Sequence, residues 1–235
     1  MYGWRSRIGM LYPSAGISEA EFYRLAPDGV SIHTTRMSFK RSNLEEVRHL
    51  SRHIEEGARL LADAKVHLIA FNCTAGSLAE GKGHDRKIIQ AIEKAVGIPA
   101  TTTATAVLEA LEKLGKRRII LITPYVEAVN ETEIKFLRDH GHEVVASVGL
   151  GIDDPYQQAA VDPKYWYQLA RERRDVGGDV YFISCAGIRV VEMIAAIEHD
   201  TGLPVVTSNQ ALMWHCLKLL ELQPDSADYG ELFRI

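Results

Sequence analysis

The sequence predicts an α/β protein built from two similar lobes, each with a parallel sheet of four strands. Short apolar segments alternate with amphipathic helical segments along all 235 residues, which is typical of parallel sheets with helices on their faces. The apolar segments are nearly continuous, as in strands that are buried on both faces. The first half of the chain also resembles the second half, which predicts two related lobes rather than one large sheet.

The elements follow one another in a regular order. Seven segments have the apolar, β-branched composition of strands: Arg7–Tyr12, Gly29–Thr34, Val66–Phe71, Arg118–Thr123, Glu143–Val148, Asp179–Ser184 and Pro204–Thr207. Seven others have the spacing of amphipathic helices: Ser42–Ala64, Asp85–Val96, Ala104–Leu114, Val126–Asp139, Pro163–Val176, Ile188–Asp200 and Ala211–Leu222.

Three landmarks recur in the same order in both halves of the chain. A Pro closes the first apolar segment of each half, a Cys follows a later one, and a Gly-hydrophobic-Pro triplet comes after the next helix. The two prolines are 111 residues apart and the two cysteines 112. The paired landmarks are Pro13 and Pro124, Cys73 and Cys185, and residues 97–99 and 202–204.

This repeat predicts two Rossmann-like (flavodoxin-like) lobes related by a pseudo-twofold axis. We assign residues 1–112 together with 212–235 to the first lobe, and residues 113–211 to the second. Ligands of open α/β sheets bind beyond the carboxyl ends of the strands. Because Cys73 and Cys185 each follow a strand, we expect them on opposite walls of one active-site cleft between the lobes.

Two facing thiols can serve as acid and base, or as nucleophile and proton donor. Each cysteine is expected at a helix N-terminus, where unpaired amides and the helix dipole lower a thiol pKa. Small residues follow both, including Ala186 and Gly187, and let backbone amides approach a carboxylate. Cys216 lies instead among leucines at helical spacing and is interpreted as a core residue.

Composition excludes several classes of function. A formal net charge of −4 argues against a nucleic-acid partner, and no apolar run reaches the length of a membrane span. The N-terminal apolar run is too short for a signal peptide, and three cysteines suit reduced thiols. These features predict a cytoplasmic protein that does not bind membranes. The sequence leaves open whether it forms a homo-oligomer.

Three weaker signals favour structural interpretations. Residues 76–83 nearly spell a phosphate-binding loop, but Gly83 stands where a Mg²⁺-binding hydroxyl is needed. His49 and His53 lie four apart without the interior Glu of a zinc protease, so no metal site is predicted. Arg189 could clamp a carboxylate, although a surface position is the simpler interpretation.

Over nearly its whole length the chain resembles the aspartate/glutamate racemase superfamily, in the branch of maleate cis–trans isomerases and arylmalonate decarboxylases. The resemblance rests on four motifs and the C-terminal sequence: 72–74, 123–125 followed by Asn130, 184–187, 202–208 and 229–233. It implies catalysis without metal or organic cofactor. Cys73 matches the isomerases and racemases, since the decarboxylases resemble one another in having glycine there. The loop Pro13–Ile17 is closer to the decarboxylases.

The resemblance implies that a substrate carboxylate is held by the hydroxyls of Ser14, Thr74 and Tyr125, with Asn130, Ala186 and Gly187 completing the site. The leading hypothesis is therefore a cofactor-independent, two-cysteine isomerase of a small mono- or dicarboxylate, most similar to maleate cis–trans isomerases. An arylmalonate-type decarboxylase or an Asp/Glu-type racemase is the alternative enzyme. The alternative without catalysis is a two-lobed small-molecule binding module.

Overall fold

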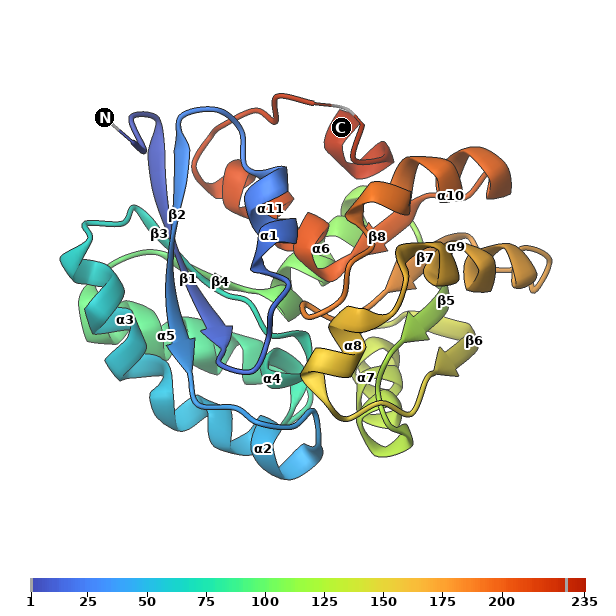
Figure 1. Cartoon of the computed structure of the whole chain (residues 1–235), viewed down its shortest axis with the longest axis horizontal. Helices are drawn as coiled ribbons and strands as arrows, with labels where there is room; N and C mark the ends of the chain where they lie inside the picture. Colours follow the sequence, from blue (N-terminus) through green and yellow to red (C-terminus); the bar gives the residue numbers. More distant parts are fainter. Residues whose placement is uncertain (1, 227) are drawn as a thin grey trace.

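The computed structural model describes residues 2–226 and 228–235, and it contains two parallel four-stranded sheets (Figure 1). The first sheet has the order β2-β1-β3-β4 and the second the order β6-β5-β7-β8, so each strand of one sheet has a counterpart in the other. Their bounds are β1 (Ser6–Pro13), β2 (Val30–Met37), β3 (Leu68–Phe71), β4 (Ala100–Thr102), β5 (Arg118–Thr123), β6 (Glu143–Gly149), β7 (Val180–Ile183) and β8 (Val205–Thr207). The predicted fold class is confirmed.

Helices cover both sheets. In the first half these are α1 (Glu19–Leu25), α2 (Leu44–His49), α3 (Ile54–Asp63), α4 (Thr74–Leu78), α5 (His84–Val96) and α6 (Thr103–Lys113). In the second half they are α7 (Glu127–Asp139), α8 (Pro155–Ala160), α9 (Pro163–Glu172), α10 (Ile194–Thr201) and α11 (Ser208–Leu219), with 3₁₀ turns η1 (Leu50–His53), η2 (Val191–Met193) and η3 (Glu231–Arg234).

The two helices that follow the edge strands β4 and β8 join the lobes. Helices α6 and α11 pack against each other, and each contacts both β4 and β8. Their N-caps are equivalent: Thr102 accepts a hydrogen bond from the Thr105 amide, and Thr207 accepts one from the Gln210 amide. One continuous apolar cluster contains buried residues of both sheets, from Ile8 to Val206. The assignment of residues 212–235 to the first lobe stays a prediction, because α11 contacts both.

The predicted helix Ser42–Ala64 is wrong as a single element. It is divided into α2, η1 and α3. The 3₁₀ turn has three residues per turn and keeps Leu50 in the core between Val47 and Ile54, all at most 2% exposed. Helices α1, α4 and α8 and strand β4 have seven residues or fewer, too few for a period to be visible in the sequence.

The carboxyl ends of the central strands of both sheets meet in the middle of the molecule (Figure 1). Strands β1 and β3 end near the ends of β5 and β7, and the connections that follow them form the site described next. Among the described residues, the helices are all too short or too polar to cross a membrane.

Candidate active site

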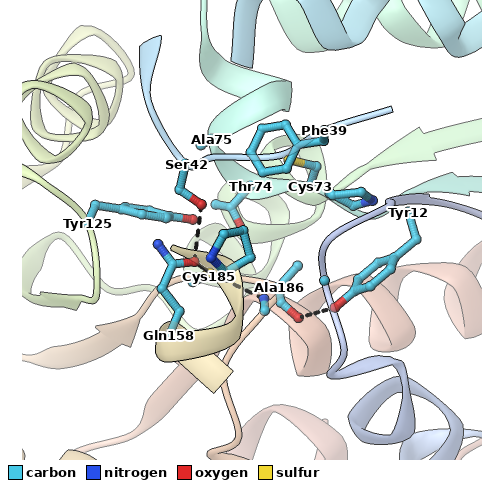
Figure 2. A pocket seen from close by; sticks show the side chains of 14 residues that line it. Tyr12, Phe39, Ser42, Cys73, Thr74, Ala75, Tyr125, Gln158, Cys185 and Ala186 are labelled. Atoms are coloured by element: carbon cyan, nitrogen blue, oxygen red, sulfur yellow. Dashed lines mark hydrogen bonds between the residues drawn. The ribbon is translucent and has the colours of Figure 1, made fainter. Parts of the chain in front are cut away.

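A small cavity with about 30 Å³ of free space lies between the lobes. Figure 2 shows the side chains that line it, contributed by strand ends, connections and short helices of both lobes. Six of the predicted site residues meet there: Cys73, Thr74, Tyr125, Cys185, Ala186 and Gly187. The cavity is also lined by Tyr12, Pro13, Gly16, Phe39, Ser42, Ala75, Pro155 and Gln158.

Two predicted site residues do not line this cavity. The Ser14 hydroxyl donates to the Phe39 carbonyl oxygen at 3.1 Å and accepts from the Phe39 amide at 3.0 Å, so it holds together the ends of β1 and β2. Asn130 accepts a hydrogen bond from the Thr123 hydroxyl and donates one to Ser147. These bonds fix the loop that presents Tyr125.

Cys73 is the N-cap of α4, as the strand-to-helix pattern predicts. Its sulfur accepts a hydrogen bond from the Gly76 amide at 3.4 Å. A Cβ added at Gly76 would lie 3.0 Å from this sulfur, so glycine lets the amide come close. Asn72, directly before Cys73, is fully buried and donates to Asn209 of α11 at 3.1 Å, which ties this strand end to the helix joining the lobes.

Cys185 is followed by a turn, not by the helix predicted from Ile188 onward. Regular helix α10 begins only at Ile194, after the 3₁₀ turn η2. The Gly187 amide donates to the Cys185 sulfur at 3.2 Å. The backbone of Cys185 has φ 132°, a conformation that favours glycine, and its amide is held by the Ser208 hydroxyl at 3.0 Å. The same hydroxyl accepts from Thr74 of the first lobe at 2.7 Å.

The expected lowering of the cysteine pKa values is wrong for the structure as it stands. Burial raises the pKa of the Cys73 thiol to about 12, although the Gly76 amide opposes this shift. Burial also raises the pKa of Cys185, to about 11, against opposing hydrogen bonds from the Tyr125 hydroxyl and the Gly187 amide. The amides act in the predicted direction, but desolvation outweighs them. The charge of Cys185 adds to the rise in the pKa of Cys73.

A buried carboxyl group lies behind the second thiol, and no pattern in the sequence predicted it. Glu133 of α7 is 0% exposed, and its Oε1 accepts from the hydroxyl of Ser184 at 2.6 Å, next to Cys185. The other oxygen, Oε2, has no hydrogen-bond partner among the described residues. Burial raises the pKa of Glu133 to about 7, and its negative charge raises the pKa values of Cys185 and Tyr125.

Tyr12 fills the wall of the cavity beside the first loop. Its hydroxyl donates to the Ala186 carbonyl at 3.3 Å and accepts from the Ser18 amide at 3.2 Å, so the ring spans the two lobes. A Cβ at Gly16 would lie 2.6–2.9 Å from this ring. A side chain at residue 16 therefore has no room while Tyr12 occupies the wall.

A hydrogen bond also crosses the cavity between Ser42 of the first lobe and Gln158 of α8 in the second. The Ser42 hydroxyl donates to Gln158 Oε1 at 3.1 Å, and the Ser42 amide donates to the Asp153 carbonyl at 2.7 Å. The Cys185 thiol donates to the same Oε1, with sulfur and oxygen 3.8 Å apart. Figure 2 shows Ser42, Tyr125 and Gln158 pointing toward one another above Cys185.

The remaining sequence signals lie away from this cavity. Cys216 is 0% exposed in α11, which confirms its core position. Lys82 of the glycine-rich segment donates to the Asp139 carbonyl, and Arg189 donates to the Ala159 carbonyl. Across the described residues, no group of three or more metal-ligating side chains comes together, so His49 and His53 form no such cluster.

Several residues that line the cavity or lie behind its wall were outside the sequence predictions. Tyr12 could have been found from the repeat, because it precedes Pro13 as Thr123 precedes Pro124. Ser42, Gln158 and Glu133 have no counterpart that the repeat identifies. Only the packing of connections 39–43 and 152–158 over the strand ends brings Ser42 and Gln158 together.

Comparison with known proteins supports this picture. A family model described as arylmalonate decarboxylase matches residues 8–233. The chain is 29% identical over 240 residues to a maleate isomerase of Pseudomonas putida KT2440, covering 96% of each chain. It is also 29% identical over 233 residues to an arylmalonate decarboxylase of Bordetella bronchiseptica, covering 96% of this chain and 95% of that one.

Solved structures agree at the level of the whole fold. A maleate isomerase from Pseudomonas putida S16, solved with maleate as a variant with one cysteine replaced by alanine, superposes with a TM-score of 0.93 at 25% identity and 97% coverage of each chain. The match of the family model spans nearly the entire sequence, including both cysteine motifs. The chain therefore belongs to the arylmalonate decarboxylase family, in the branch of the aspartate/glutamate racemase superfamily that also holds the maleate isomerases.

Proposed function

We propose that the protein is a cofactor-independent cis–trans isomerase of a small unsaturated carboxylate of the maleate class. The observation that carries the proposal is the presence of two thiols, Cys73 and Cys185, one from each lobe, in the lining of one cavity. A decarboxylase needs a single proton donor at this place, whereas addition to a double bond uses a nucleophile and an acid.

The reaction follows from this arrangement. The thiolate of one cysteine attacks a vinylic carbon and forms a carbon–sulfur bond, while the π electrons move to the neighbouring carbon and its carboxylate. The thiol of the other cysteine protonates that carbon, which leaves a saturated adduct with a single bond between the two carbons. After rotation about this bond, loss of the proton to the same cysteine and of the sulfur restores the double bond in the trans form.

The backbone around the thiols suits the carboxylate that takes up this charge. The first amides of α4, which begins at Thr74, have no partner within the helix. The turn at Ala186 and Gly187 lies against the opposite wall of the cavity. Amides of this kind stabilise an oxyanion as it develops. We also propose that the enzyme is cytoplasmic and that its substrate is a small carboxylic acid. A homo-oligomer stays a prediction.

Incorporation of deuterium from deuterium oxide into the product tests the proposal. Purified protein given maleate is expected to form fumarate, followed by proton NMR, with the vinylic protons retained. Activity should persist after dialysis against a chelator. Deuterium at the α-carbon of an amino acid or other chiral acid, without isomerisation of maleate, would instead identify a racemase.

Decarboxylation is the second candidate. The equal identity to the Bordetella decarboxylase and to the Pseudomonas isomerase supports it, as does the absence of a side chain at Gly16. Release of carbon dioxide from an arylmalonate at a useful rate, undiminished by Cys73→Ala, would replace the isomerase proposal with this one.

A further inference from the structure

The lining of the cavity is uncharged. None of the 14 described residues that form it has an acidic, basic or histidine side chain. Unpaired backbone amides at the start of α4, which begins at Thr74, can hold one carboxylate, but a second carboxylate buried here would need charge-assisted donors of its own. Two arginines lie next to lining residues, and each is paired with a carboxylate. Arg36 donates to the Gly16 carbonyl and pairs with Glu19, and Arg41, next to Ser42, pairs with Asp153 at 3.0 Å.

The orientation of the Gln158 side chain decides whether a hydrogen-bond donor or an acceptor faces the cavity at this end. Its Nε2 donates to the backbone carbonyl of Ile152 at 2.7 Å. A carbonyl oxygen only accepts hydrogen bonds, so the nitrogen must be the atom that faces Ile152. The amide oxygen, Oε1, is therefore the atom that faces the cavity. Gln158 is 1% exposed, and this bond fixes its side chain.

Donors from both lobes already converge on this oxygen. The Ser42 hydroxyl donates to Oε1 at 3.1 Å, and the Cys185 thiol approaches it at 3.8 Å. A Cβ on Gly187 would lie 3.8 Å from the same oxygen and 3.5 Å from the Cys185 sulfur, so Oε1 stands directly beside the reacting thiol. A carboxylate placed here would meet a partial negative charge, while a donor would be attracted.

We infer that Gln158 selects a substrate whose second end is an uncharged hydrogen-bond donor, a carboxamide, so that the enzyme acts on the half-amide of a cis-unsaturated diacid in preference to the diacid itself. This inference rests on the proposed isomerase function and specifies its substrate class. The carboxylate end binds the backbone amides, and the –NH₂ of the other end donates to Gln158 Oε1.

The test compares maleate with its monoamide, (Z)-4-amino-4-oxobut-2-enoate, in the wild-type enzyme. The monoamide gains a hydrogen bond to Gln158 Oε1 and avoids the repulsion between this oxygen and a second carboxylate. We therefore expect its kcat/KM to exceed that of maleate by about tenfold or more. Gln158→Met keeps the length of the side chain but removes the acceptor. The ratio of kcat/KM for the monoamide to kcat/KM for maleate should therefore fall toward one. Ser42→Ala keeps the acceptor and should retain the preference. Gln157→Met is the matched control, because Gln157 is exposed beside Gln158.

Binding of saturated analogues separates recognition from chemistry. Succinamate is expected to bind wild-type protein more tightly than succinate, measured by calorimetry, with the difference lost in Gln158→Met. If wild-type enzyme isomerises maleate as well as or better than the monoamide, and succinate binds at least as tightly as succinamate, the inference is overturned while the isomerase proposal stands. If neither maleate nor its monoamide is isomerised but succinamate binds more tightly than succinate, the isomerase proposal fails and the selectivity of Gln158 is supported.

Discussion

Three donors converge on the sulfur of Cys185, whereas one reaches the sulfur of Cys73. Cys185 has the Tyr125 hydroxyl and the amides of Gly187 and Ile188 as partners, and Cys73 has the Gly76 amide. Both thiols are at least 93% buried. Burial raises the pKa of Cys73 to about 12 and that of Cys185 to about 11, and more hydrogen bonds oppose this shift at Cys185.

Alkylation should follow this order. With iodoacetamide, Cys185 is expected to react faster than Cys73, and both rates should rise between about pH 7 and about pH 9, since the thiolate is the reactive form. Cys216 is 0% exposed and has no hydrogen bond to offset the burial that raises its pKa, so it should remain unmodified. Peptide mapping by mass spectrometry measures each site, and faster labelling of Cys216 than of Cys73 would contradict the prediction.

Removal of either active-site thiol should abolish isomerisation. Cys73→Ala and Cys185→Ala are each expected to lower kcat at least about a hundredfold, because each removes a proton-transfer or nucleophilic step. Initial rates of fumarate formation from maleate provide the measurement. Cys216→Ala is the control and should keep near wild-type turnover. A double variant no worse than either single one would show that the thiols act as a unit.

At the scale of elements, the N-terminus of α11 positions the second thiol. Thr207 caps this helix in a capping box with Gln210, and Ser208, the first helical residue, holds the Cys185 amide. The Gln210 side chain also donates to the Tyr229 carbonyl at 2.6 Å. This cap therefore connects β8, the reactive turn and the C-terminal segment.

Thr207→Ala should destabilise the protein by about 1 kcal/mol through loss of the cap. Urea unfolding followed by circular dichroism measures the change. Thr207→Ser keeps the hydroxyl and should recover most of the stability. A Ser variant as unstable as the Ala variant would show that packing of the methyl group, and not the cap, is what matters at this residue.

Elements with strong periodicity were predictable from the sequence, and short ones were not. The strand Arg118–Thr123 was predicted with the bounds that the structure shows, because its apolar run is continuous, preceded by charges and followed by Pro124. The turn after Cys185 was missed, since the apolar residues Ile188, Val190 and Val191 have a spacing that also suits a helix. The repeat located both thiols, but the hydrogen bond between Ser42 and Gln158 depends on packing between segments more than 100 residues apart.

At the scale of the whole molecule, a buried carboxyl group makes stability depend on pH. Burial raises the pKa of Glu133 from 4.5 to about 7, so the folded state favours its protonated form. Its contribution to the free energy of unfolding is fully present below pH 4.5 and is lost as the pH rises to about 7.

Glu133→Gln isolates this effect, because the amide keeps an acceptor for Ser184 but does not titrate. The stability of wild type minus that of the variant should fall by a few kcal/mol at most between pH 4.5 and about 7, and then level off. Urea unfolding of both proteins at a series of pH values measures the difference. The comparison is needed because burial lowers the pKa values of three histidines, which makes stability rise with pH in part of this range: His84, His142 and His215. A constant difference would place the carboxyl group in a more polar environment.

The positive φ of Cys185 has a consequence for the balance between stability and activity. At 132° the backbone suits a residue without a Cβ, and such strain costs of order 1–3 kcal/mol. Cys73 has φ −152°, which any residue adopts. Cys185→Gly should therefore melt at a higher temperature than Cys185→Ala, whereas Cys73→Gly should melt below Cys73→Ala. If so, selection for thermal stability alone would favour glycine at residue 185 and inactivate the protein. Keeping a cysteine at this turn therefore lowers thermal stability in return for a thiol in the active site.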